Sequence, residues 1–145
     1  MRYSDYIDAL PPGTCPFCAS DDRRFFENKT AYVTYALAPY HKHHLLIVPN
    51  EHKKSFLQLS PEELADIQDL AHQSARLLRY LGYDSFTLMV REGMGSGKSV
   101  EHLHYHFIPD IRLGDLDHAH GVRAIMSDGE LQSLVTELRN AIDQL

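Results

Sequence analysis

Short apolar stretches with the period of a β-strand alternate along this chain with longer stretches that have the period of a helix. Four stretches rich in β-branched, aromatic and aliphatic residues are expected to form strands, at 31–36, 44–49, 86–91 and 101–109. Two stretches repeat apolar residues every three to four positions and are expected to form helices, at 60–82 and about 127–145. The order strand, strand, helix, strand, strand, helix predicts an α+β fold, in which two main helices accompany an antiparallel β-sheet.

The two predicted helices have recognisable ends. Ser60, Pro61 and Glu63 provide an N-cap and a capping box for the first helix, and Gly82 ends it. Its buried face is expected to comprise Leu64, Ile67, Leu70, Ala71, Leu77, Leu78 and Leu81. The second helix, capped by residues 127–130, is expected to bury Leu131, Leu134, Val135, Leu138 and Ile142.

Composition is that of a globular chain with one domain, residues 1–145. Hydrophobic residues make up 43% and charged residues 23%, and no apolar run approaches the roughly 20 residues of a membrane span. The first residues lack the apolar core of a signal peptide, so a cytoplasmic location without a membrane partner is expected. A net charge of −6 argues against a broad nucleic-acid-binding surface.

Three histidines occupy alternate positions in the last predicted strand. His102, His104 and His106 should leave one face of the strand, while the apolar residues between and after them point into the core. A core strand has no structural need for three polar rings on one face, because burying unpaired ring nitrogens is costly. The row therefore predicts either a metal site with an open position or a catalytic site with a nucleophilic ring.

A glycine-rich loop at 93–100 leads directly into the histidine row and favours the second interpretation. Its glycines let backbone N–H groups approach an anion, and Lys98 adds positive charge. It is not a Walker A loop, because the required spacing is absent and a strand is expected to follow. A phosphate-sized loop beside a histidine row indicates chemistry on a phosphate.

The only two cysteines, Cys15 and Cys18, form a C-x-x-C knuckle at about 14–19. In a reducing compartment this pattern indicates metal or redox chemistry, and its proline-rich setting differs from the strand–helix context of a thioredoxin motif. A zinc ion needs two further ligands, which histidines must supply here because no second C-x-x-C exists. The free candidates are His52 and one member of the histidine row.

The stretch 97–109 resembles the motif of the histidine triad (HIT) family, His-x-His-x-His after a Gly/Ser-rich loop. The resemblance extends from about Cys15 to the last helix and is strongest to the branch of diadenosine tetraphosphate phosphorylases and related hydrolases. It implies a HIT-like fold, a homodimer, and a nucleotide or dinucleotide substrate. The implied activity is that of a nucleotide hydrolase or nucleotidyltransferase, acting on dinucleoside polyphosphates or nucleoside phosphoramidates.

The resemblance also implies residue roles. A structural zinc would be held by Cys15, Cys18, His52 and His102. If His102 binds the metal it cannot attack, so His104 becomes the nucleophile that forms a covalent nucleotidyl-histidine, resolved by water or inorganic phosphate. His106 and Ser99 are the other predicted catalytic residues, contacting phosphate oxygens and the leaving atom. Gly97, Lys98 and His44 are predicted to bind substrate.

Four positions depart from the family pattern. Ala36 stands eight residues before His44, where relatives place Asn or Asp to bind the ribose hydroxyls, so weak ribose recognition is expected. The turn 39–44 reads Pro-Tyr-His-Lys-His-His in place of Pro-Tyr-x-Pro-Gly-His, and Lys98 replaces a frequent glutamine. The Arg-Trp pair that often follows the proline at position 109 is missing.

Two alternative classes remain open at this point. One is a metal-dependent enzyme in which His102, His104 and His106 together hold the ion, and the other is a non-enzymatic nucleotide-binding module. The sequence does not specify the base, the leaving group, the acceptor or the pathway. Four further histidines have no assigned role and are expected on the surface or in loops: His41, His43, His118 and His120.

Overall fold

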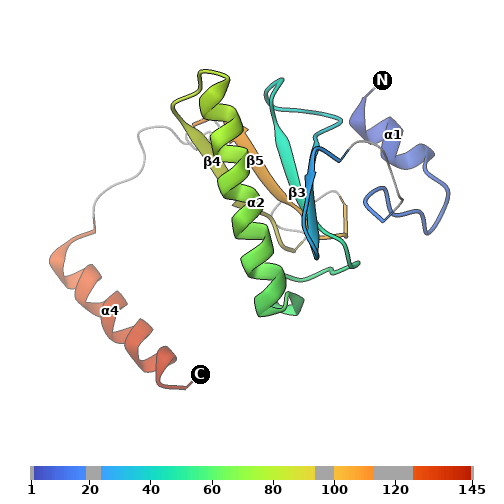
Figure 1. Cartoon of the computed structure of the whole chain (residues 1–145). Coiled ribbons are helices and arrows are strands. Elements are labelled where there is room, and N and C mark those ends of the chain that lie inside the picture. Colours follow the sequence, from blue (N-terminus) through green and yellow to red (C-terminus); the bar gives the residue numbers. More distant parts are fainter. Residues whose placement is uncertain (1, 19–23, 94–99, 113–125, 145) are drawn as a thin grey trace. The chain divides into compact units, whose positions relative to one another are not determined.

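The chain is built around one antiparallel sheet and one long helix, seen in a computed structural model that describes residues 2–18, 24–93, 100–112 and 126–144 (Figure 1). The strands are β1 (Phe26–Glu27), β2 (Ala31–Tyr35), β3 (Leu45–Pro49), β4 (Phe86–Val90) and β5 (Tyr105–Pro109). The helices are α1 (Tyr3–Ala9), the 3-10 turn η1 (Phe56–Gln58), α2 (Pro61–Tyr80) and α4 (Asp128–Ile142). All the predicted elements are present; α1, β1 and η1 were not predicted.

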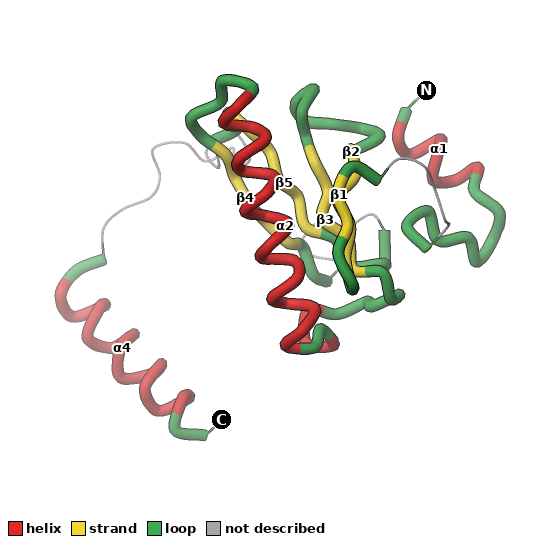
Figure 2. The backbone as a smooth tube through the Cα atoms, viewed as in Figure 1, coloured by secondary structure: helices red, strands yellow, loops and turns green. Residues whose placement is uncertain are grey.

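The sheet brings two distant parts of the sequence side by side. Its strand order is β1-β2-β3-β5-β4, and every neighbouring pair is antiparallel (Figure 2). The predicted pairing of the strand at 86–90 with the strand at 105–109 is confirmed. Because β3 pairs with β5, the segment that follows the Pro39 turn lies directly beside the end of the histidine row.

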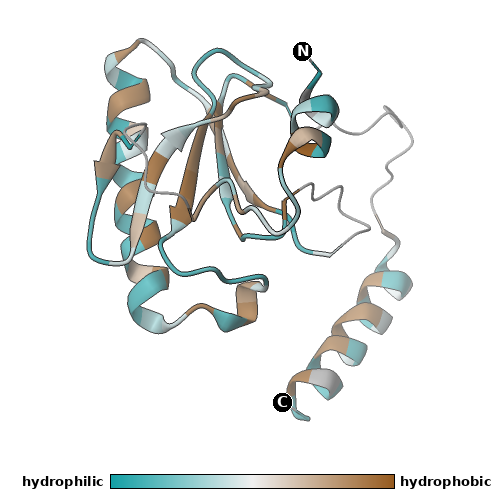
Figure 3. Cartoon of the chain, turned by 90° about the vertical axis from the view of Figure 1, so that its right-hand side faces the viewer, coloured by the Kyte–Doolittle hydropathy of each residue, from teal (hydrophilic) through white to brown (hydrophobic). Residues whose placement is uncertain are grey.

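Helix α2 covers one face of the sheet and closes the core. It packs against β2, β3 and β5, and Figure 3 shows that the sheet beneath it is largely hydrophobic. The buried side chains of this core are Ala31, Val33, Leu45, Ile47, Leu59, Ile67, Leu70, Ala71, Leu78, Leu103, Tyr105 and Phe107. The predicted capping box is confirmed, since Ser60 Oγ accepts from the Glu63 amide at 3.1 Å and Glu63 Oε1 accepts from the Ser60 amide at 3.0 Å.

The prediction that Leu64 and Leu81 lie on the buried face is wrong, because they are 39% and 45% exposed. A helix of 20 residues is about 30 Å long, whereas strands of five residues span about 17 Å. Both ends of α2 therefore extend past the sheet, and these two leucines lie near those ends.

The histidine row is a strand only in part, which corrects the prediction of a strand over 101–109. Strand β5 begins at Tyr105, so His102 and His104 precede it. The backbone there bonds to the loop after β3 and not to a strand, as the Leu103 amide donates to the Lys53 carbonyl at 2.7 Å. The alternation nevertheless holds, because Leu103, Tyr105 and Phe107 all lie in the core.

The loop that receives this bond is itself fixed by α2. Lys53 Nζ lies 3.3 Å from a carboxylate oxygen of Glu63, in the first turn of the helix, and also donates to the Gln58 carbonyl at 3.1 Å. The cap of α2 therefore helps to hold the segment that carries His52 against the segment that carries His102.

Residue contacts divide the chain into two units, 1–112 and 113–145, so one domain spanning the whole chain stays a prediction. In the second unit α4 is capped by Ser127 and Glu130, as expected. Its apolar residues Leu131, Val135, Leu138 and Ile142 are exposed, contrary to the prediction of a buried face. An apolar stripe needs another element to cover it, and this unit has no second helix or strand among its described residues. No described helix is both long and apolar enough to cross a membrane.

Candidate functional site

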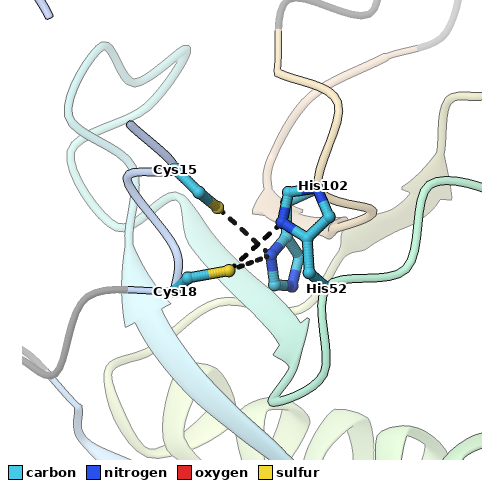
Figure 4. Close-up of side chains that lie close together, drawn as sticks. All are labelled: Cys15, Cys18, His52 and His102. Atoms are coloured by element: carbon cyan, nitrogen blue, oxygen red, sulfur yellow. Dashed lines mark hydrogen bonds between the residues drawn. The ribbon is translucent and has the colours of Figure 1, made fainter. Parts of the chain in front are cut away.

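Four side chains from three separate segments of the sequence converge at one end of the sheet. The ligand atoms of Cys15, Cys18, His52 and His102 all lie within 4.8 Å of one another. His102 Nδ1 is 3.3 Å from each of the two sulfurs, and His52 Nδ1 is 3.1 Å from Cys18 Sγ (Figure 4). The structure therefore brings together the four residues predicted as metal ligands.

Backbone and ring contacts hold the cluster in place. The Tyr32 hydroxyl donates to the Phe17 carbonyl at 2.8 Å, which attaches the cysteine knuckle to β2. His102 Nε2 lies 2.8 Å from the Pro49 carbonyl, which can only accept, so this nitrogen carries the proton. The lone pair of His102 is thereby on Nδ1, the atom that faces both sulfurs.

The donor set fits a small tetrahedral cation. Two thiolates and two imidazoles are a common zinc site, in which bonds of about 2.3 Å to sulfur and 2.0–2.1 Å to nitrogen imply S···N separations of about 3.5 Å. The observed 3.1–3.3 Å is shorter by only a few tenths of an ångström. Partial burial and the adjacent Cys15 thiol raise the pKa of Cys18 to about 11, and a bound cation would lower it by stabilising the thiolate.

His104 is buried beside the cluster with its tautomer fixed. Its Nδ1 lies 2.9 Å from the carbonyl of His102, so Nδ1 donates and Nε2 keeps its lone pair. The ring of Phe17 lies 5.0 Å from the ring of His104 and limits its movement. The arrangement leaves an unprotonated nitrogen on the ring predicted to be the nucleophile.

A second chain of hydrogen bonds fixes the tautomers of His44 and His106. The Tyr40 amide donates to His44 Nδ1 at 3.2 Å, so the proton of the neutral His44 ring is on Nε2. His44 Nε2 then donates to His106 Nδ1 at 2.9 Å. His106 must carry its own proton on Nε2, which makes that atom a hydrogen-bond donor.

Both rings of this chain are neutral at ordinary pH. Burial, together with the neighbouring His104 ring, lowers the pKa of His44 to about 4 and that of His106 to about 3. A smaller contribution to both shifts comes from the positive charge of Arg91. The hydrogen-bond directions deduced above for neutral rings therefore apply at neutral pH.

Arg91 and Tyr40 flank the histidines and were not identified from the sequence as a pair. Arg91 Nη2 lies 3.5 Å from the Tyr40 hydroxyl, and the guanidinium carbon is 5.9 Å from the centre of the Tyr40 ring. The Tyr40 ring in turn stacks on His44 at 5.8 Å. The one signal available in the sequence for a role of Arg91 was its place at the end of the predicted strand 86–91, just before the glycine-rich loop.

The extra histidines of the 39–44 turn form a separate contact group. His43 Nδ1 lies 2.6 Å from the Tyr83 hydroxyl, and the His43 amide donates to His41 Nδ1 at 3.0 Å. They pack against Tyr83 and are not members of the metal cluster.

Several predicted residues lie outside the described ranges: Gly97, Lys98, Ser99, His118 and His120. Within those ranges, the one cluster of three or more groups able to hold a metal contains His102 but neither His104 nor His106. The alternative of a metal held by the whole histidine row gains no support from this geometry.

Acidification should destabilise the fold through His44 and His106. Their folded pKa values lie below the ordinary 6.5, so the unfolded chain binds more protons as the pH falls. The stability that depends on their neutral forms is complete above about pH 6.5 and is lost as the pH falls towards 4 and then 3. A His44→Asn/His106→Asn variant should therefore lose less unfolding free energy than wild type between pH 6.5 and 4, measured by urea titration.

His72 is exposed, so the His72→Asn variant is the matched control, and its unfolding free energy should depend on pH as that of wild type does. The metal ligands are identical in all three proteins, so any effect of metal release cancels in the differences. Equal pH slopes for the double variant and wild type would contradict the assignment.

Comparison with known proteins gives a consistent result. The HIT domain family model matches residues 19–113. An adenosine 5'-monophosphoramidase of Schizosaccharomyces pombe is 32% identical over 73 residues, which cover 50% of this chain and 53% of the relative. A bis(5'-adenosyl)-triphosphatase of Saccharomyces cerevisiae is 29% identical over 96 residues, covering 63% of this chain and 46% of the relative. The chain thus matches about half the length of each of these two relatives.

Solved structures share the fold at low sequence identity. A histidine triad nucleotide-binding protein from Candida albicans has a TM-score of 0.72 at 20% identity, covering 90% of this chain and 99% of that one. A zinc-bound histidine triad family protein from Mycobacterium smegmatis has a TM-score of 0.61 at 21% identity, covering 88% and 97%. Since the family model covers well over half of the sequence and the fold agrees, the chain belongs to the histidine triad (HIT) family.

Proposed function

We propose that this chain is a nucleotide hydrolase or nucleotidyltransferase that acts through a covalent nucleotidyl intermediate on His104. The observation that carries the proposal is the hydrogen bond from His104 Nδ1 to the His102 carbonyl, which puts the lone pair of the neutral ring on Nε2, the nitrogen that would attack. The matched relatives named as a phosphoramidase and a dinucleoside triphosphatase support chemistry at a nucleotide phosphorus.

In the first step a bond forms between His104 Nε2 and the phosphorus, while the bond from phosphorus to the leaving group breaks. The leaving group takes the electron pair of the broken bond and a proton from solvent, and the water that attacks in the second step releases a proton to solvent in turn. As Nε2 becomes bonded the ring becomes cationic, and the hydrogen bond from Nδ1 to the His102 carbonyl becomes charge-assisted and stronger. Water or inorganic phosphate then attacks the phosphorus and returns the electron pair to Nε2.

The neighbouring rings support this step by donating hydrogen bonds. Since His44 Nε2 donates to His106 Nδ1, His106 can present a proton on Nε2 to a phosphate oxygen. The neutral state of both rings, with pKa values of about 4 and 3, keeps this direction of donation at cellular pH. The roles of Ser99 at the leaving atom, and of Gly97 and Lys98 at the phosphate, belong to the same proposal.

The metal cluster would hold a zinc ion with a structural role. Cys15, Cys18, His52 and His102 would supply all four ligands, which leaves no coordination position for substrate. The ion would cross-link the N-terminal knuckle, the loop after β3 and the segment before β5. Because His102 also supplies the carbonyl that orients His104, this cross-link would stabilise the geometry of the reacting ring.

The remaining parts of the proposal follow the family membership. A nucleotide or dinucleotide is the proposed substrate, a homodimer the proposed assembly and the cytoplasm the proposed location. A nucleotide-binding module without turnover is the competing function, favoured by Ala36 and by the absence of the Arg-Trp pair. Assaying turnover on a panel of nucleotides separates the two, because the module would bind without releasing product.

Protein purified without chelators should contain one zinc ion per chain. Cys15→Ser removes one of four ligands, so it should lower both the zinc content, by elemental analysis, and the melting temperature, since metal binding contributes folding free energy. The His72→Ala variant, altered on the exposed side of α2, should keep both values. Metal-free wild-type protein, or a Cys15→Ser protein with unchanged zinc and melting temperature, would refute the assignment.

Replacing His104 with alanine should reduce turnover by at least about 10³-fold, because no other group can take over the covalent step. Zinc content and the melting temperature should change little. Rapid-quench mass spectrometry of wild-type protein should detect a nucleoside monophosphate adduct on His104, and added imidazole should partly restore a His104→Gly variant. Near-normal activity of His104→Ala, or an adduct on another residue, would exclude the mechanism.

Discrimination between ribose and deoxyribose substrates should be weak. The Ala36 amide donates to the His44 carbonyl at 3.1 Å, and the Ala36 methyl packs against the cluster of Tyr32, Leu46 and Val48. The position therefore offers no polar side-chain atom to the ribose. A site that hydrogen-bonds a substrate hydroxyl can reject analogues that lack this hydroxyl by as much as ~10⁴-fold. The ratio of kcat/KM for matched ribo- and deoxyribonucleotides is expected within about tenfold, and a strong ribose preference would show that another residue binds the diol.

A further inference from the structure

Arg91 is a cation beside the histidines that takes part in none of the ion pairs found among the described residues. Those pairs involve Arg24, Lys29, Lys53 and Lys54. The polar contact of Arg91 in the described part of the chain is with the neutral hydroxyl of Tyr40, at 3.5 Å. A half-buried guanidinium that no carboxylate of the described ranges neutralises is well suited to bind an anion.

The strand register places Arg91 beside the reacting histidines. Met89 pairs with His106 and Val90 pairs with Tyr105, so the chain continues from β4 along the segment that carries His104. The charge of Arg91 is also close enough to contribute to the lowered pKa of both His44 and His106. Arg91 is therefore a permanent positive charge next to rings that are themselves neutral.

Tyr40 determines where this charge lies. The Arg91 guanidinium contacts the Tyr40 ring. The Tyr40 ring also stacks on the ring of His44, which in turn donates to His106. The phosphate under attack must lie within about 3–3.5 Å of the nucleophile, close to the rings of His104 and His106. Through the contacts observed, Arg91 is connected to His106 by way of Tyr40 and His44, which suits it to the next anionic group along the substrate.

We propose that Arg91, positioned by Tyr40, binds a phosphate on the leaving-group side of the substrate and gives the enzyme a preference for nucleoside polyphosphates over phosphoramidates. A phosphoramidate loses a neutral amine and offers no anion at this place. A polyphosphate loses a group that carries its own negative charge, which the planar guanidinium can bind with two parallel hydrogen bonds. The inference rests on the proposed function, because it assigns the substrate class of the same site.

The experiment compares kcat/KM for bis(5'-adenosyl) triphosphate and for adenosine 5'-phosphoramidate. Arg91→Gln should lower kcat/KM for the triphosphate by roughly 10- to 100-fold, the effect of losing a charge-assisted hydrogen bond, and leave the phosphoramidate within about threefold. Arg91→Lys should recover part of the loss. Tyr40→Leu should lower the ratio of kcat/KM for the triphosphate to kcat/KM for the phosphoramidate, because the guanidinium loses the ring that it contacts. Arg79→Gln removes an equal charge from the exposed surface of α2, across the sheet from the histidines, and should leave the ratio unchanged.

Equal losses on both substrates would overturn the inference, because Arg91 would then contact the phosphate under attack. An unchanged ratio would overturn it as well. If wild-type protein turns over neither substrate, the proposed function fails, and calorimetric binding of ADP and AMP decides the role of Arg91 separately. Wild type should then bind ADP at least tenfold more tightly than AMP, and Arg91→Gln should remove that difference; equal affinities in wild type would refute the assignment.

Discussion

His102 connects the four-residue cluster, the sheet and the ring of His104 through three different atoms. Its Nδ1 faces the two cysteine sulfurs, its Nε2 donates to the Pro49 carbonyl at the end of β3, and its own carbonyl accepts from His104 Nδ1. Loss of any one contact would free the ring or the backbone that the other two depend on. A metal ion in the cluster would therefore influence the chemistry through the orientation of His104, without touching the substrate.

The tautomers of His44 and His106 are fixed by hydrogen bonds, as is that of His102. A hydrogen bond donated to one ring nitrogen determines that the proton is on the other nitrogen. The Tyr40 amide determines the tautomer of His44, and His44 determines that of His106. Burial keeps both rings neutral, with pKa values of about 4 and 3, so no change of charge interrupts the chain at cellular pH. On the proposed function, the positive charge for a phosphate must come from elsewhere, and among the described residues at this site Arg91 would provide it.

Local sequence patterns predicted the main helix and most strands but missed the elements whose placement depends on distant partners. Helix α2 and strands β2 to β4 follow from their own patterns, whereas β1 has two residues and exists because β2 lies beside it. The start of β5 could not be predicted, since Leu103 bonds to Lys53, a partner 50 positions earlier. The cysteine knuckle and the histidine row were identifiable from spacing, but Arg91 and Tyr40 carry no spacing signal because their relation exists only across the fold.

The altered turn at 39–44 shows which features of the site are constrained. Lys42 and His43 depart from the expected Pro-Gly, and in this turn the His44 amide donates to the His41 carbonyl at 2.9 Å while the Tyr40 amide donates to His44. The constraint is therefore on the backbone geometry that fixes His44, and several sequences can satisfy it. The backbone groups that determine the tautomers of the histidines are in place, whereas Ala36 offers no polar side-chain atom. On the proposed function, this separation would keep the reaction of the family and alter which nucleotides it acts on.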